Sequence, residues 1–181
     1  MKHLEEVQAR IKRKNQILFT QDSIFLADLK DLIERQNHQT LILWALELAE
    51  ETVRILLNRY PNEHRFELAV ILTRDWSEGK VKMAVAKHAI LQVHAVAKEI
   101  TSLEDIALCH AIGQACSVVH TRKHALGFPI YDLTAIIRHY GLPQCEELLI
   151  SRKQLYIERL LYWNKHHKDE KYVWADFLLQ Q

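Results

Sequence analysis

Glycine and proline are scarce in this 181-residue chain, which has four glycines and three prolines. They fall mainly between segments that have helical periodicity, and no segment shows the alternation of a β-strand or a fixed-period repeat. Because the glycines stand alone at positions 79, 113, 127 and 141, a glycine-rich phosphate loop is excluded. We therefore predict an all-α, single-domain multi-helix bundle of seven to nine helices that spans residues 1–181.

The chain also lacks long apolar runs, and its net charge is small. No run reaches the ~20 residues that a membrane helix needs, so we expect no membrane association. Charges interrupt the first fourteen residues, MKHLEEVQARIKRK, which argues against a signal peptide and favours a cytoplasmic location. The formal net charge is +1, so we expect no nucleic-acid partner either.

Cysteine is scarce too, with three residues, an odd number. Cys109 and Cys116 are seven residues apart in a helical segment, which separates them by about 10.5 Å. A disulfide requires Cα atoms within about 7 Å. We predict that all three thiols are reduced and mostly buried, and burial argues against a nucleophilic role.

What the chain does contain is an uncharged stretch in its middle. Residues 106–121 include no Asp, Glu, Lys or Arg, although 26% of the chain is charged. Apolar residues recur there at helical spacing and cover most of the helix surface, which is typical of a helix at the centre of a bundle. A narrow polar stripe remains at His110, Gln114, Ser117 and Thr121.

Two other predicted helices carry features that bear on function. The helix at about residues 40–59 has Glu47, Glu50 and Glu51 on its polar face, which is either a partner-binding edge or an ordinary solvated face. The helix at about residues 81–100 has two apolar stripes. One consists of Met83, Ala86, Ile90, Val93 and Ala97, and the other places His88 beside Val81, Ala84, Val85 and Leu91.

The carboxy-terminal part forms a helical extension of about residues 144–181. It has a long helix to about residue 167 and a short aromatic helix from Tyr172 to Leu179. If the aromatic segment packs on another chain, the protein forms a homodimer.

Histidine is abundant, with eleven residues. His120 and His124, four residues apart on the expected helix, share a metal ion if both side chains point the same way. The zinc protease signature fails because Thr121 stands where it needs Glu. His94, His110 and Asp132 are the candidates for a third ligand. We favour His94, because a short loop makes its helix antiparallel to the next one.

The set His94, His120 and His124 resembles the metal triad of DinB-like bundles. That likeness implies a divalent metal cofactor and a hydrolase or transferase, with Asp132 as the nearest general base. The alternative is a buried polar cluster, in which these histidines bond to one another, to the backbone or to Asp132.

A wider pattern runs from residue 44 to residue 135, in matching order and spacing. It consists of Trp44-Ala45-Leu46, Ala49-Glu50, Tyr60-Pro61, Trp76, Gly79, Met83, His94-Ala95, Ala97, Gly113-Gln114-Ala115, His120, His124-Ala125-Leu126-Gly127, Tyr131 and Ala135. Over roughly residues 40–140 the chain resembles the all-helical immunity protein family of bacterial polymorphic toxin systems. The resemblance implies a protein that binds and neutralises a cognate toxin, with no catalytic residues and no cofactor. The last forty residues have no counterpart in this pattern.

Overall fold

The computed structural model describes residues 2–169 and 171–180, with all their side chains except those of residues 2, 3 and 143. These residues form nine α-helices and no β-strand, so the all-α prediction is confirmed. None of the described helices is long and apolar enough to cross a membrane. The helices are α1 (Lys2–Lys12), α2 (Ala27–Glu34), α3 (His38–Arg59), α4 (Arg65–Ser77), α5 (Met83–Glu99), α6 (Leu103–Ser117), α7 (Gly127–Tyr140), α8 (Glu146–His166) and α9 (Asp176–Leu179).

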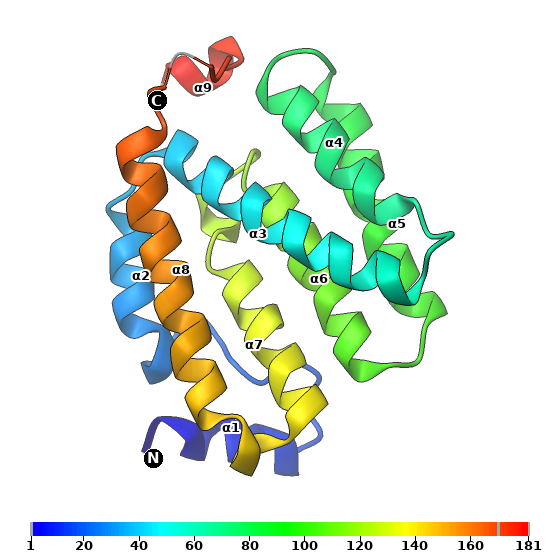
Figure 1. Ribbon diagram of the computed structural model, residues 1–181, viewed down its shortest axis with the longest axis vertical. Helices are drawn as coiled ribbons and strands as arrows, with labels where there is room; N and C mark the ends of the chain where they lie inside the picture. Colours follow the sequence, from blue (N-terminus) through cyan, green and yellow to red (C-terminus); the bar gives the residue numbers. More distant parts are fainter. Residues whose placement is uncertain (1, 170, 181) are drawn as a thin grey trace.

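Helix α6 lies at the centre of the bundle, as its uncharged sequence predicts. It packs against α3, α4, α5 and α7, and α3 in turn packs against α4 and α8. Figure 1 shows α4 and α5 along one edge of the molecule, α2 and α8 along the other, and α3 crossing between them. One cluster of buried apolar side chains extends from Leu4 in α1 to Leu178 in α9.

Local sequence signals set where several helices begin and end. The Asn37 side chain accepts a hydrogen bond from the Thr40 amide and caps α3. Pro129 stands in the first turn of α7, where its missing N–H is tolerated. Gly79 follows α4 and Gly141 ends α7, both at φ +78°, a conformation that disfavours residues with a side chain.

The centre of the core is aromatic. Trp44, Phe128 and Tyr156 are fully buried, and the Tyr156 ring meets both others edge-on, at centroid distances of 6.4 Å to Trp44 and 6.3 Å to Phe128. Trp44 Nε1 donates to the main-chain oxygen of Tyr156 at 3.0 Å. These contacts join α3, α7 and α8, so residues more than a hundred positions apart form one packed unit.

The structure shows that the two apolar stripes of α5 have different surroundings. Of the first stripe, Ala86, Ile90, Val93 and Ala97 are buried, whereas Met83 is exposed. The second stripe does not face the core, because its side chains lie on the outer side of the α4–α5 edge: Ala84, Val85, His88 and Leu91 are exposed and only Val81 is half-buried.

The aromatic carboxy-terminal segment packs on its own chain. The Phe177 ring stacks on Trp76 of α4 at a centroid distance of 5.7 Å, and the Ala175 amide donates to the Ser77 oxygen at 2.8 Å. The helix in this segment is shorter than expected, since α9 covers only Asp176–Leu179.

Candidate functional site

Two half-buried histidines face each other between α5 and α6. His94 Nδ1 lies 2.9 Å from His110 Nδ1, and the two ring centroids are 5.1 Å apart. One nitrogen must donate and the other accept, so this hydrogen bond requires at least one neutral ring. Tyr131 of α7 covers the other side of His110 at a centroid distance of 5.2 Å.

Two glycines make room for polar side chains beside this pair. A Cβ atom at Gly113 would lie 2.4 Å from the His94 ring, so only glycine lets α5 and α6 approach this closely. A Cβ atom at Gly127 would lie 2.4 Å from Gln114 Oε1, which accepts a hydrogen bond from His124 Nδ1 at 2.9 Å. The residues that make these contacts all belong to the pattern behind the family resemblance, and the structure shows that they pack directly against one another: His94, Gly113, Gln114, His124 and Gly127.

The environment of these histidines favours their neutral forms. Burial lowers the pKa of His94, and the neighbouring His110, His124 and Lys98 lower it further. Burial also lowers the pKa of His110. It lowers the pKa of His124 as well, with added repulsion from His120. The cluster is therefore stable as a set of uncharged, hydrogen-bonded rings at neutral pH.

His120 takes no part in the two hydrogen bonds of this cluster, although it is near enough to repel a charge on His124. The prediction that His120 and His124 share a helix is wrong, because α6 ends at Ser117. Thr121 is extended, with φ −154° and ψ 137°, and its side chain accepts from the Lys123 amide to begin a short 3-10 helix at Arg122–His124. The exposed His120 ring stacks on Trp76, at a centroid distance of 6.5 Å.

The structure does not bring the predicted metal triad together. His94 bonds to His110, His124 bonds to Gln114, and His120 stacks on Trp76. Within the described part of the chain, no group of three or more His, Cys, Asp or Glu side chains is arranged to hold a metal ion.

Asp132, predicted as a partner of the histidines, lies elsewhere. It is buried beside α8, where it accepts hydrogen bonds from Arg152 Nε at 2.8 Å and from the Tyr156 hydroxyl. Burial and the Asp132 charge raise the pKa of Tyr156. Asp132 is therefore a structural ion-pair partner and is not placed to serve as a base for the histidines.

The three predicted partner-binding carboxylates contact other helices of the same chain. Trp163 Nε1 of α8 donates to Glu47 Oε2 at 2.6 Å. Glu51 pairs with Arg159 and lies 3.5 Å from Arg152, both also in α8. This part of the α3 surface is covered by α8, so it is not the solvated face that its polarity predicts.

Glu50 likewise pairs with Arg74 of α4. With its two neighbours it forms a seam, called here the carboxylate seam, that consists of Glu47, Glu50, Glu51 and their partners on α4 and α8. The structure does not present these carboxylates as a free edge.

The cysteines are free and buried. Burial raises the pKa of Cys109 and of Cys116 to about 12, and it raises the pKa of Cys145 as well. At neutral pH these groups are thiols, which are poor nucleophiles. Reduced, buried cysteines are what the sequence predicts.

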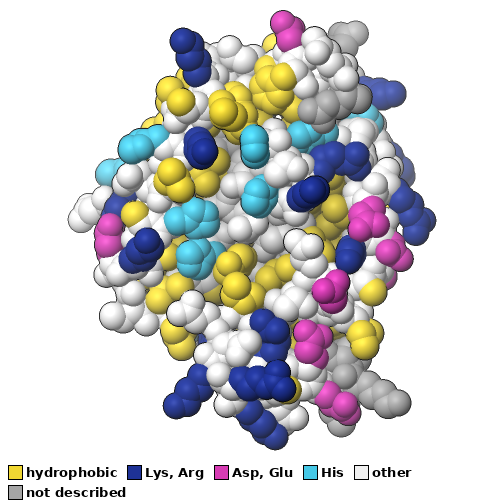
Figure 2. All heavy atoms as spheres, turned by 180° about the vertical axis from the view of Figure 1, so that it is seen from behind, with side chains coloured by type: hydrophobic (Ala, Val, Ile, Leu, Met, Phe, Trp, Pro, Cys, Tyr) yellow, Lys and Arg dark blue, Asp and Glu magenta, His cyan; other side chains and the backbone are white. Residues whose placement is uncertain are grey.

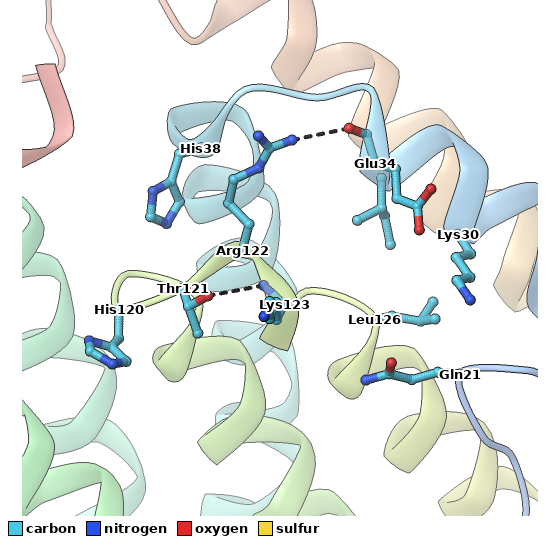
Figure 3. Close-up of a pocket in the computed structure, with 10 residues that line it drawn as sticks. Gln21, Lys30, Glu34, His38, His120, Thr121, Arg122, Lys123 and Leu126 are labelled. Atoms are coloured by element: carbon cyan, nitrogen blue, oxygen red, sulfur yellow. Dashed lines mark hydrogen bonds between the residues drawn. The ribbon is translucent and has the colours of Figure 1, made fainter. Parts of the chain in front are cut away.

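An open pocket that the sequence analysis missed lies between α2, the start of α3 and residues 118–126. Its volume is about 830 Å³. Figure 3 shows His38 and His120 on one side, Lys30 and Gln21 on the other, and Lys123 between them. The charged and imidazole side chains that line it are Lys30, Glu34, His38, His120, Arg122 and Lys123.

A sequence signal for this pocket did exist, since residues 120–124 read HTRKH, the most basic stretch near the centre of the chain. Of the basic residues in this stretch, only the two histidines entered the prediction of a functional site. Figure 2 shows that histidines on the back of the molecule lie among lysines and arginines, whereas the visible Asp and Glu side chains gather mainly along one edge.

Comparison with known proteins gives one match. A family model described as Imm-5 like putative immunity protein matches residues 31–159. The match confirms the resemblance and extends it beyond residues 40–140 into α8, so part of the carboxy-terminal extension does have a counterpart. No curated protein and no solved structure matches the chain significantly. The chain belongs to the family of Imm-5 like putative immunity proteins.

Proposed function

We propose that this protein binds and neutralises a cognate toxin of a bacterial polymorphic toxin system, and that it does so by occlusion, without catalysing a reaction. The observation that carries the proposal is the family match over residues 31–159. An inhibitor of this kind needs a complementary surface of about 800 Å² on each partner.

The contacts of the reactive side chains support a binding role. The thiols are buried, Asp132 is paired with Arg152, and His94 and His124 are hydrogen-bonded within the chain. Among the described residues these groups are held for structure, and none is poised beside a second group with which it would form a nucleophile and base pair. The free cysteines also support action in the reducing cytoplasm.

Co-expression tests the proposal directly. A candidate toxin, taken from the genes that neighbour the gene of this protein, is expressed in a sensitive host, with and without this protein. We expect growth to be restored, and the two purified proteins to co-elute as a stoichiometric complex. Continued killing, while the protein accumulates in folded form, would contradict the proposed function.

Metal content tests the enzyme alternative. We expect no stoichiometric zinc, iron, nickel or manganese by elemental mass spectrometry, in protein made without a histidine tag and then incubated with zinc and desalted. The reason is that His94, His120 and His124 have separate partners. Near-stoichiometric metal that is lost in His120→Ala would instead favour a metal-dependent enzyme.

A further inference from the structure

The pocket beside residues 118–126 concentrates positive charge in a chain that is otherwise balanced. Three cations, Lys30, Arg122 and Lys123, line it with one carboxylate, Glu34. The whole chain has only one more cation than carboxylates. With its histidines neutral, the lining therefore carries a formal charge of +2, three cations less one carboxylate.

The cations of the pocket are poorly neutralised within the chain. Arg122 donates to the main-chain oxygens of Glu34 and Gln36, which carry no formal charge. Lys30 lies 3.7 Å from Asp22, whose side chain is 94% exposed, and such solvated pairs contribute little. No ion pair of Lys123 is found within residues 2–169 and 171–180.

The walls of the pocket are held in place without a ligand. His38 Nε2 lies 2.6 Å from the Val118 oxygen, and the two Arg122 contacts tie residues 118–126 to the turn between α2 and α3. Buried Ile33 and Leu126 add apolar surface to the lining. A ligand thus meets preformed walls, which lowers the ordering cost of binding.

We propose that this pocket receives an acidic segment of the cognate toxin, with Asp or Glu carboxylates that pair with Lys30, Arg122 and Lys123. This inference rests on the proposed function, because it names the toxin as the partner. Lysine and arginine are the natural partners of carboxylates, and the apolar lining suits the methylene groups of a glutamate. The pocket has no Phe, Tyr or Trp in its lining, and the ring of His120 already stacks on Trp76, so the lining favours an acidic peptide over stacked nucleic-acid bases.

A peptide titration tests the pocket independently of any toxin. The probe is a capped hexaglutamate peptide at low millimolar concentration, followed by amide chemical shifts in nuclear magnetic resonance spectra. We expect saturable changes in the amide chemical shifts of residues 30–38 and 118–126. The double variant Lys30→Glu/Lys123→Glu should abolish these changes. The matched control is Lys12→Glu/Lys87→Glu, which changes the charge equally at exposed lysines outside the pocket and should keep the shifts.

The same titration has outcomes that overturn the inference. Absence of shifts with the peptide would do so, as would equal shifts with inorganic phosphate, which would indicate an unspecific small-anion site. Tighter binding of an oligothymidylate than of the peptide at this pocket would also overturn it and would indicate a nucleic-acid site.

The toxin itself then tests the partner. We expect Lys30→Glu/Lys123→Glu to weaken toxin binding by about tenfold or more, while Lys12→Glu/Lys87→Glu binds as the wild type does. Equal binding by both variants would overturn the pocket inference and leave the proposed function standing. Failure of the wild-type protein to bind or protect would contradict the proposed function, whatever the peptide titration shows.

Discussion

The carboxylate seam and the histidine region differ in how they handle ionisable groups at similar depth. In the seam, Glu47, Glu50 and Glu51 meet arginines and a tryptophan of α4 and α8. In the histidine region, His94 bonds to His110 and His124 bonds to Gln114, in both cases as uncharged groups, and the cations of the nearby pocket have few charged partners. The carboxylates of the seam are paired within the chain, whereas the cations of the pocket remain available to a partner.

The two regions therefore have the opposite roles to those that the polarity of their sequences suggests. A row of carboxylates on a helix looks like a surface for a partner, yet here it holds the bundle together. The basic residues after α6 look like an ordinary solvated turn, yet they line a pocket of about 830 Å³. Substitutions in the two regions should therefore differ in how much stability they cost.

The largest effect should come from the ion pair nearest the seam. Asp132→Ala leaves the guanidinium of Arg152 without its closest partner, at a side chain that is only 20% exposed. Removing one member of a buried pair costs about 3 kcal/mol or more in free energy of unfolding. Urea unfolding measures this, with the exposed Asp31→Ala as the control. Equal stabilities of the two variants would contradict a structural role for Asp132.

A smaller loss should follow from Gly113→Ala, because the added methyl group collides with the His94 ring. Overpacking of this kind costs about 1–3 kcal/mol. The double variant with His94→Ala should recover part of the loss, whereas the double variant with Gln114→Ala should not. If neither second change alters the cost of Gly113→Ala, the two helices do not interlock as described.

The histidine region should also make stability depend on pH. The folded protein lowers the pKa of His94, His110 and His124, so the unfolded chain binds protons first as the pH falls. Their stabilising contribution is complete above the unfolded pKa of about 6.5, and it is lost as the pH falls from there toward the folded pKa values.

Urea midpoints between about pH 7.5 and 5 measure this loss. His110→Gln should make the dependence shallower, because it removes one titrating ring and its repulsion of His94. The control is His64→Gln, at an exposed histidine that lies outside the cluster. A pH dependence that is unchanged in His110→Gln would place the titrating groups elsewhere.

The smallest effect should come from Glu50→Gln in the outer part of the seam. The side chains of Glu50 and Arg74 are 39% and 37% exposed, so water screens their attraction. We expect a loss of less than about 1 kcal/mol in urea unfolding. A loss as large as that of Asp132→Ala would mean that the seam acts as one cooperative network.

Sequence alone predicted the parts of the fold that depend on local patterns. The uncharged stretch of residues 106–121 predicted the central helix, α6, which ends within it at Ser117. Four members of the first apolar stripe of α5, Ala86, Ile90, Val93 and Ala97, are buried together, as their spacing indicates. Each of these signals lies within a few turns of one helix.

The errors concern which face meets which neighbour. Periodicity shows that α5 has two apolar stripes, but only the packing decides that Val85 and Leu91 are exposed. In the same way, the polarity of Glu47 does not reveal that Trp163, 116 residues later, donates to it. The histidine prediction failed because α6 ends at Ser117 and Thr121 is extended, so His120 and His124 do not share a helix and a spacing of four residues does not set the direction of their side chains.

Hydrogen–deuterium exchange of this protein, alone and with its cognate toxin, tests the central claim most directly. The account predicts new protection in residues 27–38 and 118–126, which line the basic pocket, and little change along the seam of α3 and α8. Protection that is confined to α3 and α8 would contradict the account. So would the absence of new protection at a toxin concentration that saturates the protein.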